Sequence, residues 1–375
     1  MPRPFSNIFL AILSCVSILT VSCSGQSRQG LFQYEQWTVS PPVFQPGPKG
    51  TFDDVAVKDP TIVFYQGHYH MFYTSKATAE TANTQLQYVS KGRSAVGYVS
   101  APNLQSLNSA KRHDLCEIVE DVVVAPQVFY FEPHKLWYLI AQTVVEGKPD
   151  LMPIYLTNPD LSDVQGWSKP EIIKTRKSNN GFWIDFWVIC DEAKAHLFFT
   201  DHEGSLFRME CPIDTFPNGY ANEREETVLA ERGENPQGRW RLHEGSHIYY
   251  VKKADKYLAL LEAVYPHPTR KDYWDSRSRF MFAMVADKLE GPWRRVELGP
   301  NEFAGDPRNL FTEDGSRSIY DQVSHFELIR SGVNQRLEIE DFNLELLFQA
   351  FDASGMDGSY DYNDLPWELA VMRNY

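Results

Sequence analysis

The sequence has no block of basic residues and carries an excess of acidic ones. It contains 36 Lys and Arg against 50 Asp and Glu, a formal net charge of −14 at pH 7. Such a chain has little with which to neutralise a phosphate backbone, so we expect no nucleic-acid partner. Glycine and proline, 22 and 23 of 375 residues, are too sparse for a fibrous or disordered protein, and 43% hydrophobic residues suffice for a sizeable core.

Cysteine is also scarce. Of the 5 cysteines, Cys116, Cys190 and Cys211 lie beyond the N-terminal segment. Their odd number and wide spacing match no metal-binding motif, which argues against a zinc site. Cys190 lies in an apolar run, so we expect it to be a buried structural thiol.

Aromatic residues, by contrast, make up 14% of the chain. Two interpretations are open at this point: a β-sheet core, where such residues are favoured, or a platform on which an uncharged ring such as a sugar could stack.

The N-terminus reads as an export signal. Arg3 precedes an apolar run, Ile8 to Val21, that is too short and wrongly flanked for a membrane span. Small residues before Cys23 suggest lipoprotein cleavage with a lipid on Cys23, and an ordinary cleaved signal is the alternative. We therefore predict a signal peptide (1–23), a short linker (24–36) and one domain (37–375). The protein would be secreted, periplasmic or lipid-anchored at the cell surface.

Long helical periodicity is absent, and short β-branched and aromatic runs separated by turn residues indicate an all-β fold. Five hairpins are predicted, with strand pairs at 61–65 and 68–73, 127–131 and 136–140, 186–190 and 195–199, 247–251 and 256–260, and 324–330 and 335–339. The first four turns are about 60 to 66 residues apart and the last about 79, as expected for one repeated unit. We predict a five-bladed β-propeller, with a β-sandwich plus a second domain as the alternative.

Polar residues recur at the starts of the first hairpin strands. Because these strands line the channel of a propeller, the side chains at matching positions should converge on its axis. Asp59, Asp185 and His325 lie eight residues before their turns, Glu244 lies about ten before its turn, and blade two offers Gln127. Each alone also has a structural interpretation, such as a turn residue or a satisfied core histidine. Burying several like charges together costs free energy, however, and sites that bear this cost are usually functional.

Glycoside hydrolysis suits such a cluster. One carboxylic acid protonates the leaving oxygen, while a carboxylate activates water or attacks directly. A third carboxylate can tune the pKa of the acid through like-charge proximity.

Several segments resemble glycoside hydrolase family 62, the α-L-arabinofuranosidases, and more distantly family 43. They are Val57–Thr61, Ala125–Phe131, Trp183–Asp191, His243–Gly245, Ser324–His325 and Asp361–Trp367. The resemblance runs from about Trp37 to the C-terminus. It departs from the family at Ala141–Gly147, where a Trp-Gly pair usually contributes to the binding of the polymer backbone.

The resemblance implies an inverting, exo-acting enzyme that removes arabinofuranosyl side groups from arabinoxylan or a related plant polysaccharide. Asp59 would be the general base, Glu244 the general acid, and Asp185 the residue that orients and tunes the acid. The other implied roles are sugar contact for Lys58, backbone contact for Tyr362 and Asn363, and a place beside a channel metal ion, usually calcium, for His325. Within the aromatic excess, we expect Trp183, Trp187 and Tyr362 to line the sugar site.

No organic cofactor is expected, and we expect a monomer. Three alternatives stay open: a family 43-like arabinanase or xylosidase, a non-catalytic carbohydrate-binding propeller, and a structural or adhesive surface lipoprotein.

Overall fold

The structure is a computed structural model that describes residues 36–78, 94–119, 123–144, 151–175, 183–201, 203–222, 225–230, 232–235, 238–266, 274–296, 305–352 and 365–375. The predicted signal peptide with Cys23, and the predicted backbone-binding residues Tyr362 and Asn363, lie outside the described residues.

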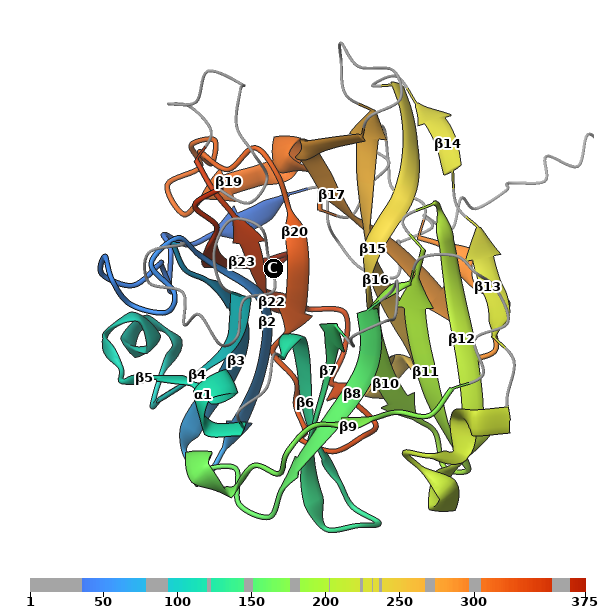
Figure 1. Cartoon of the computed structure of the whole chain (residues 1–375). Coiled ribbons are helices and arrows are strands. Elements are labelled where there is room, and N and C mark those ends of the chain that lie inside the picture. The colour runs from blue at the N-terminus through green and yellow to red at the C-terminus, as the bar shows by residue number, and fades with distance from the viewer. Residues whose placement is uncertain are drawn as a thin grey trace, which may run out of the picture.

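Five mainly antiparallel sheets surround a common axis (Figure 1). Blade one contains β2 (Ala56–Tyr65), β3 (His68–Lys76), β4 (Ser94–Ala101) and β5 (Arg112–Asp114). Blade two contains β6 (Val124–Phe131), β7 (Leu136–Val144), β8 (Leu151–Asn158) and β9 (Glu171–Ile172). Blade three contains β10 (Ile184–Cys190), β11 (Lys194–Thr200), β12 (Ser205–Pro212) and β13 (Glu226–Ala230).

The last two blades are larger. Blade four contains β14 (Arg232–Asn235), β15 (Gly238–Val251), β16 (Lys256–Pro266), β17 (Trp274–Ala286) and β18 (Arg294–Arg295). Blade five contains β19 (Leu310–Thr312), β1 (Trp37–Val39), β23 (Glu368–Arg373), β22 (Glu345–Ala350) and β20 (Ser324–Leu328). A short helix, α1 (Leu115–Val119), follows β5. No helix among the described residues has the length and apolar character needed to cross a membrane.

The blades close into a ring. The innermost strands contact one another in the order β2, β6, β10, β15 and β20, and β20 returns to β2. Blade five joins the two ends of the domain, because β1 pairs with both β19 and the C-terminal β23. The five-bladed propeller predicted from the turn spacing is therefore confirmed, and the sandwich alternative is wrong.

Four of the five predicted hairpins are confirmed, and the fifth is wrong. The partner of β20 is β22, whereas the expected return strand, β21 (Glu338–Ile339), pairs in parallel with β15. Residues 333–337, which precede β21, instead run along the ends of three other blades. The carbonyls of Val333, Gln335 and Leu337 accept hydrogen bonds from Tyr130, Cys190 and Tyr250, at the far ends of β6, β10 and β15. These backbone groups are satisfied without a hairpin.

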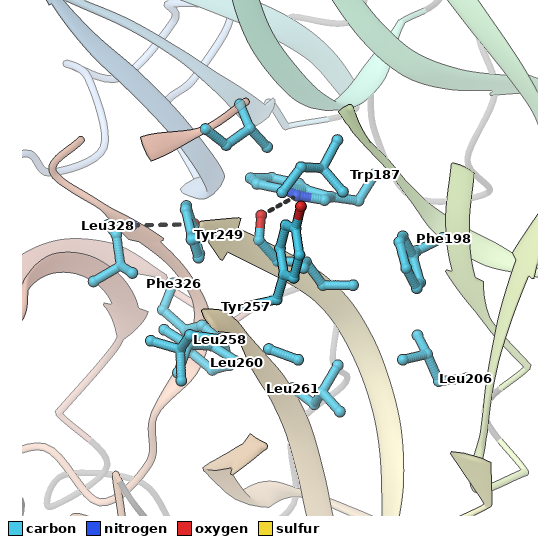
Figure 2. Packing of buried hydrophobic residues seen from close by; sticks show 14 of the residues in the cluster. Trp187, Phe198, Leu206, Tyr249, Tyr257, Leu258, Leu260, Leu261, Phe326 and Leu328 are labelled. Carbon is cyan, nitrogen blue, oxygen red and sulfur yellow. Dashed lines mark hydrogen bonds between the residues drawn. The ribbon is translucent and has the colours of Figure 1, made fainter. Parts of the chain in front are cut away.

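Most of the aromatic excess is core. Figure 2 shows Trp187 and Tyr249 among buried aliphatic side chains between blades. The Trp187 indole donates to the Ile248 carbonyl at 3.0 Å, and the Tyr249 hydroxyl accepts from the Leu328 amide at 3.2 Å. Each large side chain buried in this way contributes about 1.5–3 kcal/mol. The predicted burial of Cys190 is also confirmed, and burial raises the pKa of its thiol.

Candidate active site

Each innermost strand carries a bulge near its start. The ladder register shifts there in all five strands, and one residue at each shift has a positive φ: 47° at Asp59, 49° at Ala125, 59° at Asp185, 68° at Gly245 and 25° at His325. A bulge redirects a side chain and commonly lies beside an active site. Positive φ is costly for a residue other than glycine, and such strain collects at functional sites.

These bulges define which positions are equivalent. The predicted equivalence of Asp59, Asp185 and His325 agrees with the structure. In blade two, however, the equivalent residue is Ala125 rather than Gln127. In blade four it is Gly245, directly after Glu244.

The bulges surround one cavity at the axis. Asp59, Asp185 and His325 line it together with Pro60, Ala125, Pro126, Phe186, Trp187 and His247. Proline, tryptophan and phenylalanine supply apolar walls, and the ionisable groups come from four different blades. This mixture of apolar surface with a few converging polar groups is typical of a small-molecule site.

His325 lies at the centre of the charged groups. Its Nε2 is 3.1 Å from Asp185 Oδ2, and its Nδ1 is 3.6 Å from Asp59 Oδ1 and 3.9 Å from Glu244 Oε1. Burial by itself lowers the pKa of this imidazole, but the charges of Asp59 and Asp185 outweigh burial and raise the pKa well above its usual value. The ring is therefore a buried cation shared by carboxylates.

Asp59 and Glu244 face this cation from different blades. Since their oxygens lie 3.6 and 3.9 Å from the same His325 Nδ1, those two oxygens are at most 7.5 Å apart. The Glu244 side chain is 7% exposed and that of Asp59 is 12% exposed. Both carboxyls are thus largely removed from bulk solvent.

Asp185 holds the backbone beside Glu244. Its Oδ2 accepts a hydrogen bond from the Gly245 amide at 2.9 Å, and its carbonyl accepts one from the Ser246 hydroxyl at 2.7 Å. The Asp185 amide in turn donates to Gln142 Oε1 at 3.1 Å. This carboxylate therefore ties β10 to the bulge that presents Glu244.

Trp187 and His247 form one wall of the cavity. Their rings are stacked, with centroids 4.5 Å apart and an interplanar angle of 18°. Burial and the nearby His325 charge lower the pKa of His247 well below its usual value, so this histidine is neutral at pH 7.

Three other residues predicted for the site lie differently. Gln127 is buried away from the described cavity lining, where its amide exchanges two 2.7 Å hydrogen bonds with the Val188 backbone. Trp183 is 1% exposed and packs edge-on against Phe186 and Phe199. Lys58 is half-buried directly before Asp59 in β2.

Two residues absent from the sequence prediction contact Glu244. Arg279 of β17 donates to both Glu244 and Glu262, and Glu262 of β16 is fully buried. Glu262 is the single charge in the run Tyr257–Val264. A lone carboxylate in a buried strand needs a partner, and that signal could have identified it.

Three residues at His325 could hold a metal ion, although they supply fewer oxygen ligands than calcium takes. Asp185, Glu244 and His325 each offer one donor atom, and these atoms lie within 4.8 Å of one another. Calcium takes six to eight oxygen ligands, and a histidine ligand must be unprotonated. Both ring nitrogens of His325 face carboxylates, so an ion bound here would have to share these oxygens with the imidazole.

Comparison with known proteins places this geometry in a family. The model of "Glycosyl hydrolase family 62" matches residues 36–373. A curated relative, alpha-L-arabinofuranosidase C of Cellvibrio japonicus (strain Ueda107), is 31% identical over 341 residues, which cover 90% of this chain and 47% of the relative. The chain therefore spans about half the length of that relative.

The folds of two solved structures match that of this chain over almost their whole length. The catalytic domain of a Coprinopsis cinerea GH62 alpha-L-arabinofuranosidase has a TM-score of 0.73 at 28% identity, covering 91% of this chain and 97% of that one. A GH62 hydrolase in complex with xylotriose has a TM-score of 0.72 at 27% identity, covering 92% and 98%. From the family match across nearly the whole domain, with the ring of bulges around one acidic cavity, we conclude that the chain belongs to glycosyl hydrolase family 62.

Proposed function

We propose that this chain is an inverting, exo-acting α-L-arabinofuranosidase that removes arabinofuranosyl side groups from arabinoxylan or a related plant polysaccharide. The observation that carries the proposal is the convergence of Asp59, Asp185 and Glu244 on the cationic His325, which lines the axial cavity together with the two aspartates. Family membership and the named arabinofuranosidase relatives support the choice of sugar.

The geometry suggests a division of labour. Glu244 would protonate the glycosidic oxygen as the sugar leaves, and Asp59 would take a proton from the attacking water. Asp185 would hold the Gly245 amide and so fix the bulge from which Glu244 reaches the substrate. Trp187 and the prolines at the cavity would exclude bulk water from the reacting bond.

Inversion requires room for a water molecule between the two carboxyls. Inverting enzymes have separations of roughly 6.5–9.5 Å, against about 5–5.5 Å in retaining enzymes. The Asp59 and Glu244 oxygens are at most 7.5 Å apart, a span that includes both kinds of separation, so the anomer that is released distinguishes the two mechanisms. Proton NMR of the first-formed arabinose would test this step, because inversion releases the β anomer and initial release of the α anomer would contradict it.

Loss of the acid gives the direct test of the activity. We expect the wild type to release free arabinose from at least one of wheat arabinoxylan, sugar-beet arabinan and an aryl arabinofuranoside. Glu244→Gln should be about 100- to 10,000-fold slower on the polymer, because general acid catalysis contributes a factor of that size. Equal rates for the two proteins, or no release from any arabinofuranoside by the wild type, would refute the assignment.

The same assay separates the alternatives. A non-catalytic carbohydrate-binding propeller would bind polymer without releasing sugar, although the grouping of three carboxylates around His325 would then have no chemical role. A family 43-like arabinanase or xylosidase would release arabinose oligomers or xylose instead of single arabinose units.

The xylan preference rests on a relative whose structure contains xylotriose. Backbone contact by Tyr362 and Asn363, and sugar contact by Lys58, remain predictions of the family resemblance. Arabinoxylan and arabinan assayed at equal arabinose content would test this preference, and faster release from arabinan would contradict it.

Calcium and export also remain predictions. A fall in Tm on treatment with EDTA, restored by calcium, would support a bound ion, whereas an unchanged Tm would favour His325 as the resident cation. Lipid anchoring predicts that the full chain partitions with membranes and that Cys23→Ser releases it. Elution at 43 kDa, the mass of a single chain, would support the monomer.

A further inference from the structure

Glu262 is a buried carboxylate outside the described cavity lining. It lies on β16 directly opposite Glu244 of β15, and its side chain is 0% exposed. Like charges opposite each other on paired strands repel, and a buried charge without a partner costs several kcal/mol. A carboxylate at this position therefore requires a specific set of partners.

Arg279 provides the first partner. The same guanidinium nitrogen donates to Glu244 and to Glu262, and the Arg279 side chain is 6% exposed. Its position is therefore set by both carboxylates. Since Glu262 is fully enclosed by β15, β17 and β20, it gives the arginine a rigid attachment from which to hold the Glu244 carboxyl.

The other partners of Glu262 connect it to Asp59 through hydrogen bonds. Glu262 Oε2 accepts from the Ser324 hydroxyl at 2.5 Å and from the His325 amide at 3.0 Å. The Ser324 hydroxyl accepts from Gln349 Nε2 at 3.0 Å, and Gln349 Oε1 accepts from the Asp59 amide at 2.8 Å. The donors and acceptors alternate correctly, so the chain of hydrogen bonds from Glu262 to the Asp59 backbone is complete.

We infer that Glu262 is a positioning residue that holds the acid Glu244 through Arg279 and the base Asp59 through Ser324 and Gln349. This inference rests on the proposed function, because it concerns the two groups to which that function assigns the chemistry. Glu262 sets the geometry of the pair without touching the sugar. Small displacements of a catalytic group can cost about 100-fold in rate, so this carboxylate has a measurable kinetic role.

The contacts through Arg279 (the acid arm) and those through Ser324 and Gln349 (the base arm) should affect the kinetics differently. Misplacing an acid slows substrates with poor leaving groups much more than activated ones, because activated groups depart without a proton. Misplacing a base slows all substrates alike, because water must attack in every case. A general loss of structure would also slow all substrates alike, and would in addition lower Tm.

The test uses phenyl and 2,4-dinitrophenyl α-L-arabinofuranosides with the full domain. Glu262→Gln keeps one carbonyl oxygen that can still accept from Ser324 and the His325 amide, but its NH2 group cannot accept from Arg279, so the variant disturbs the acid side alone. For Glu262→Gln we therefore expect kcat/KM to fall about 10- to 100-fold on the phenyl substrate and less than about threefold on the dinitrophenyl substrate. Ser324→Ala should lower kcat/KM by one common factor for both substrates. Arg279→Lys, which retains the cation, serves as the second variant for the acid arm if Glu262→Gln does not fold.

A control variant and two contrary results separate the positioning role from a structural one and from failure of the proposed function. Glu226→Gln alters an exposed carboxylate paired with Arg208 in blade three and should leave both rates unchanged. Equal losses on both substrates in Glu262→Gln and Arg279→Lys would overturn the positioning role and leave a structural one. Absence of wild-type activity on every arabinofuranoside would instead refute the proposed function itself.

Discussion

Buried charged and polar side chains occur at two levels of the central channel, and the two levels are built differently. The site cluster consists of Asp59, Asp185, Glu244 and His325. The deep network consists of Thr61, Gln127, Tyr249 and Glu327, which lie a few residues further along the innermost strands, and of Arg330, which lies just beyond the end of β20. Both levels exclude solvent, so burial alone does not separate a catalytic group from a structural one.

The difference lies in the backbone and in the partners. Three members of the site cluster occupy bulges with positive φ, and their carboxylates share cations across an open cavity. In the deep network, Thr61, Gln127, Tyr249 and Glu327 lie on paired ladder positions beyond the bulges. Arg330 donates to the carbonyls of Ile62 and Val128, and Gln127 binds both backbone groups of Val188. Backbone strain beside a cavity indicates a functional residue, whereas a side chain that satisfies buried backbone groups indicates a structural one.

The largest expected effect within this comparison comes from the site cluster. Asp59→Asn removes the proposed base while keeping a side chain that tolerates positive φ. The Asp59 amide bond to Gln349 also remains possible for the variant backbone. We expect kcat on arabinoxylan to fall about 100- to 10,000-fold, with Tm within about 3 °C of the wild type. A large fall in Tm with proportionate loss of active protein would place Asp59 with the structural residues.

Sequence reasoning located the site better than it separated these two levels. Turn spacing aligned Asp59, Asp185 and His325 correctly, because each lies eight residues before its turn. In blade two the prediction named Gln127, although the same spacing of eight residues leads to Ala125, which is the equivalent residue in the structure. The backbone conformation that distinguishes Ala125 from Gln127 has no signature in the side chains themselves.

Contacts between strands were the other source of error. Glu262 and Arg279 meet Glu244 only through the pairing of β15, β16 and β17, whose bulges shift the register twice near Glu244. The fifth hairpin failed because residues 333–337 bind the ends of other blades, and no local pattern predicts such distant partners. The repeated turn spacing thus predicted the fold and the residues that lie near the axis, but not the side-chain contacts between neighbouring strands.

The second effect concerns stability in the deep network. Gln127→Met keeps the volume of the side chain but leaves the buried amide and carbonyl of Val188 without their partner. Each unsatisfied group costs about 1–3 kcal/mol, so the free energy of unfolding should fall by about 2–6 kcal/mol. Urea unfolding measures this loss, and kcat/KM of the folded protein should change by less than tenfold. If kcat/KM fell steeply at unchanged stability, Gln127 would be a substrate ligand, as the sequence predicted.

The smallest effect is a change in the pH dependence of stability, and Glu327 controls it. Burial raises the pKa of this carboxyl to about 7, despite the opposing influence of Arg330 at 3.2 Å and a 2.8 Å hydrogen bond from the Tyr249 hydroxyl. In the unfolded chain the pKa is near the ordinary value of about 4.3. Folding therefore takes up a proton between these two values. The stabilising contribution is fully present below about pH 4.3 and is lost as pH rises through about 7.

Glu327→Gln removes this proton uptake. The variant should be less stable than the wild type at every pH, because its amide nitrogen cannot accept the bonds that the carboxyl oxygens accept. The difference in unfolding free energy should nevertheless shrink by about 3 kcal/mol between pH 4.5 and 7.5, since one pKa unit corresponds to about 1.4 kcal/mol. Urea unfolding at four pH values measures the slope. Gln127→Met is the matched control, because it disturbs a buried polar residue at the same level of the channel without removing a titratable group, so its stability should follow the pH dependence of the wild type. Parallel behaviour of Glu327→Gln as well would mean that Glu327 is ionised throughout. The deep network would then hold a true ion pair, and its electrostatics would resemble those of the site cluster more closely than its backbone geometry does.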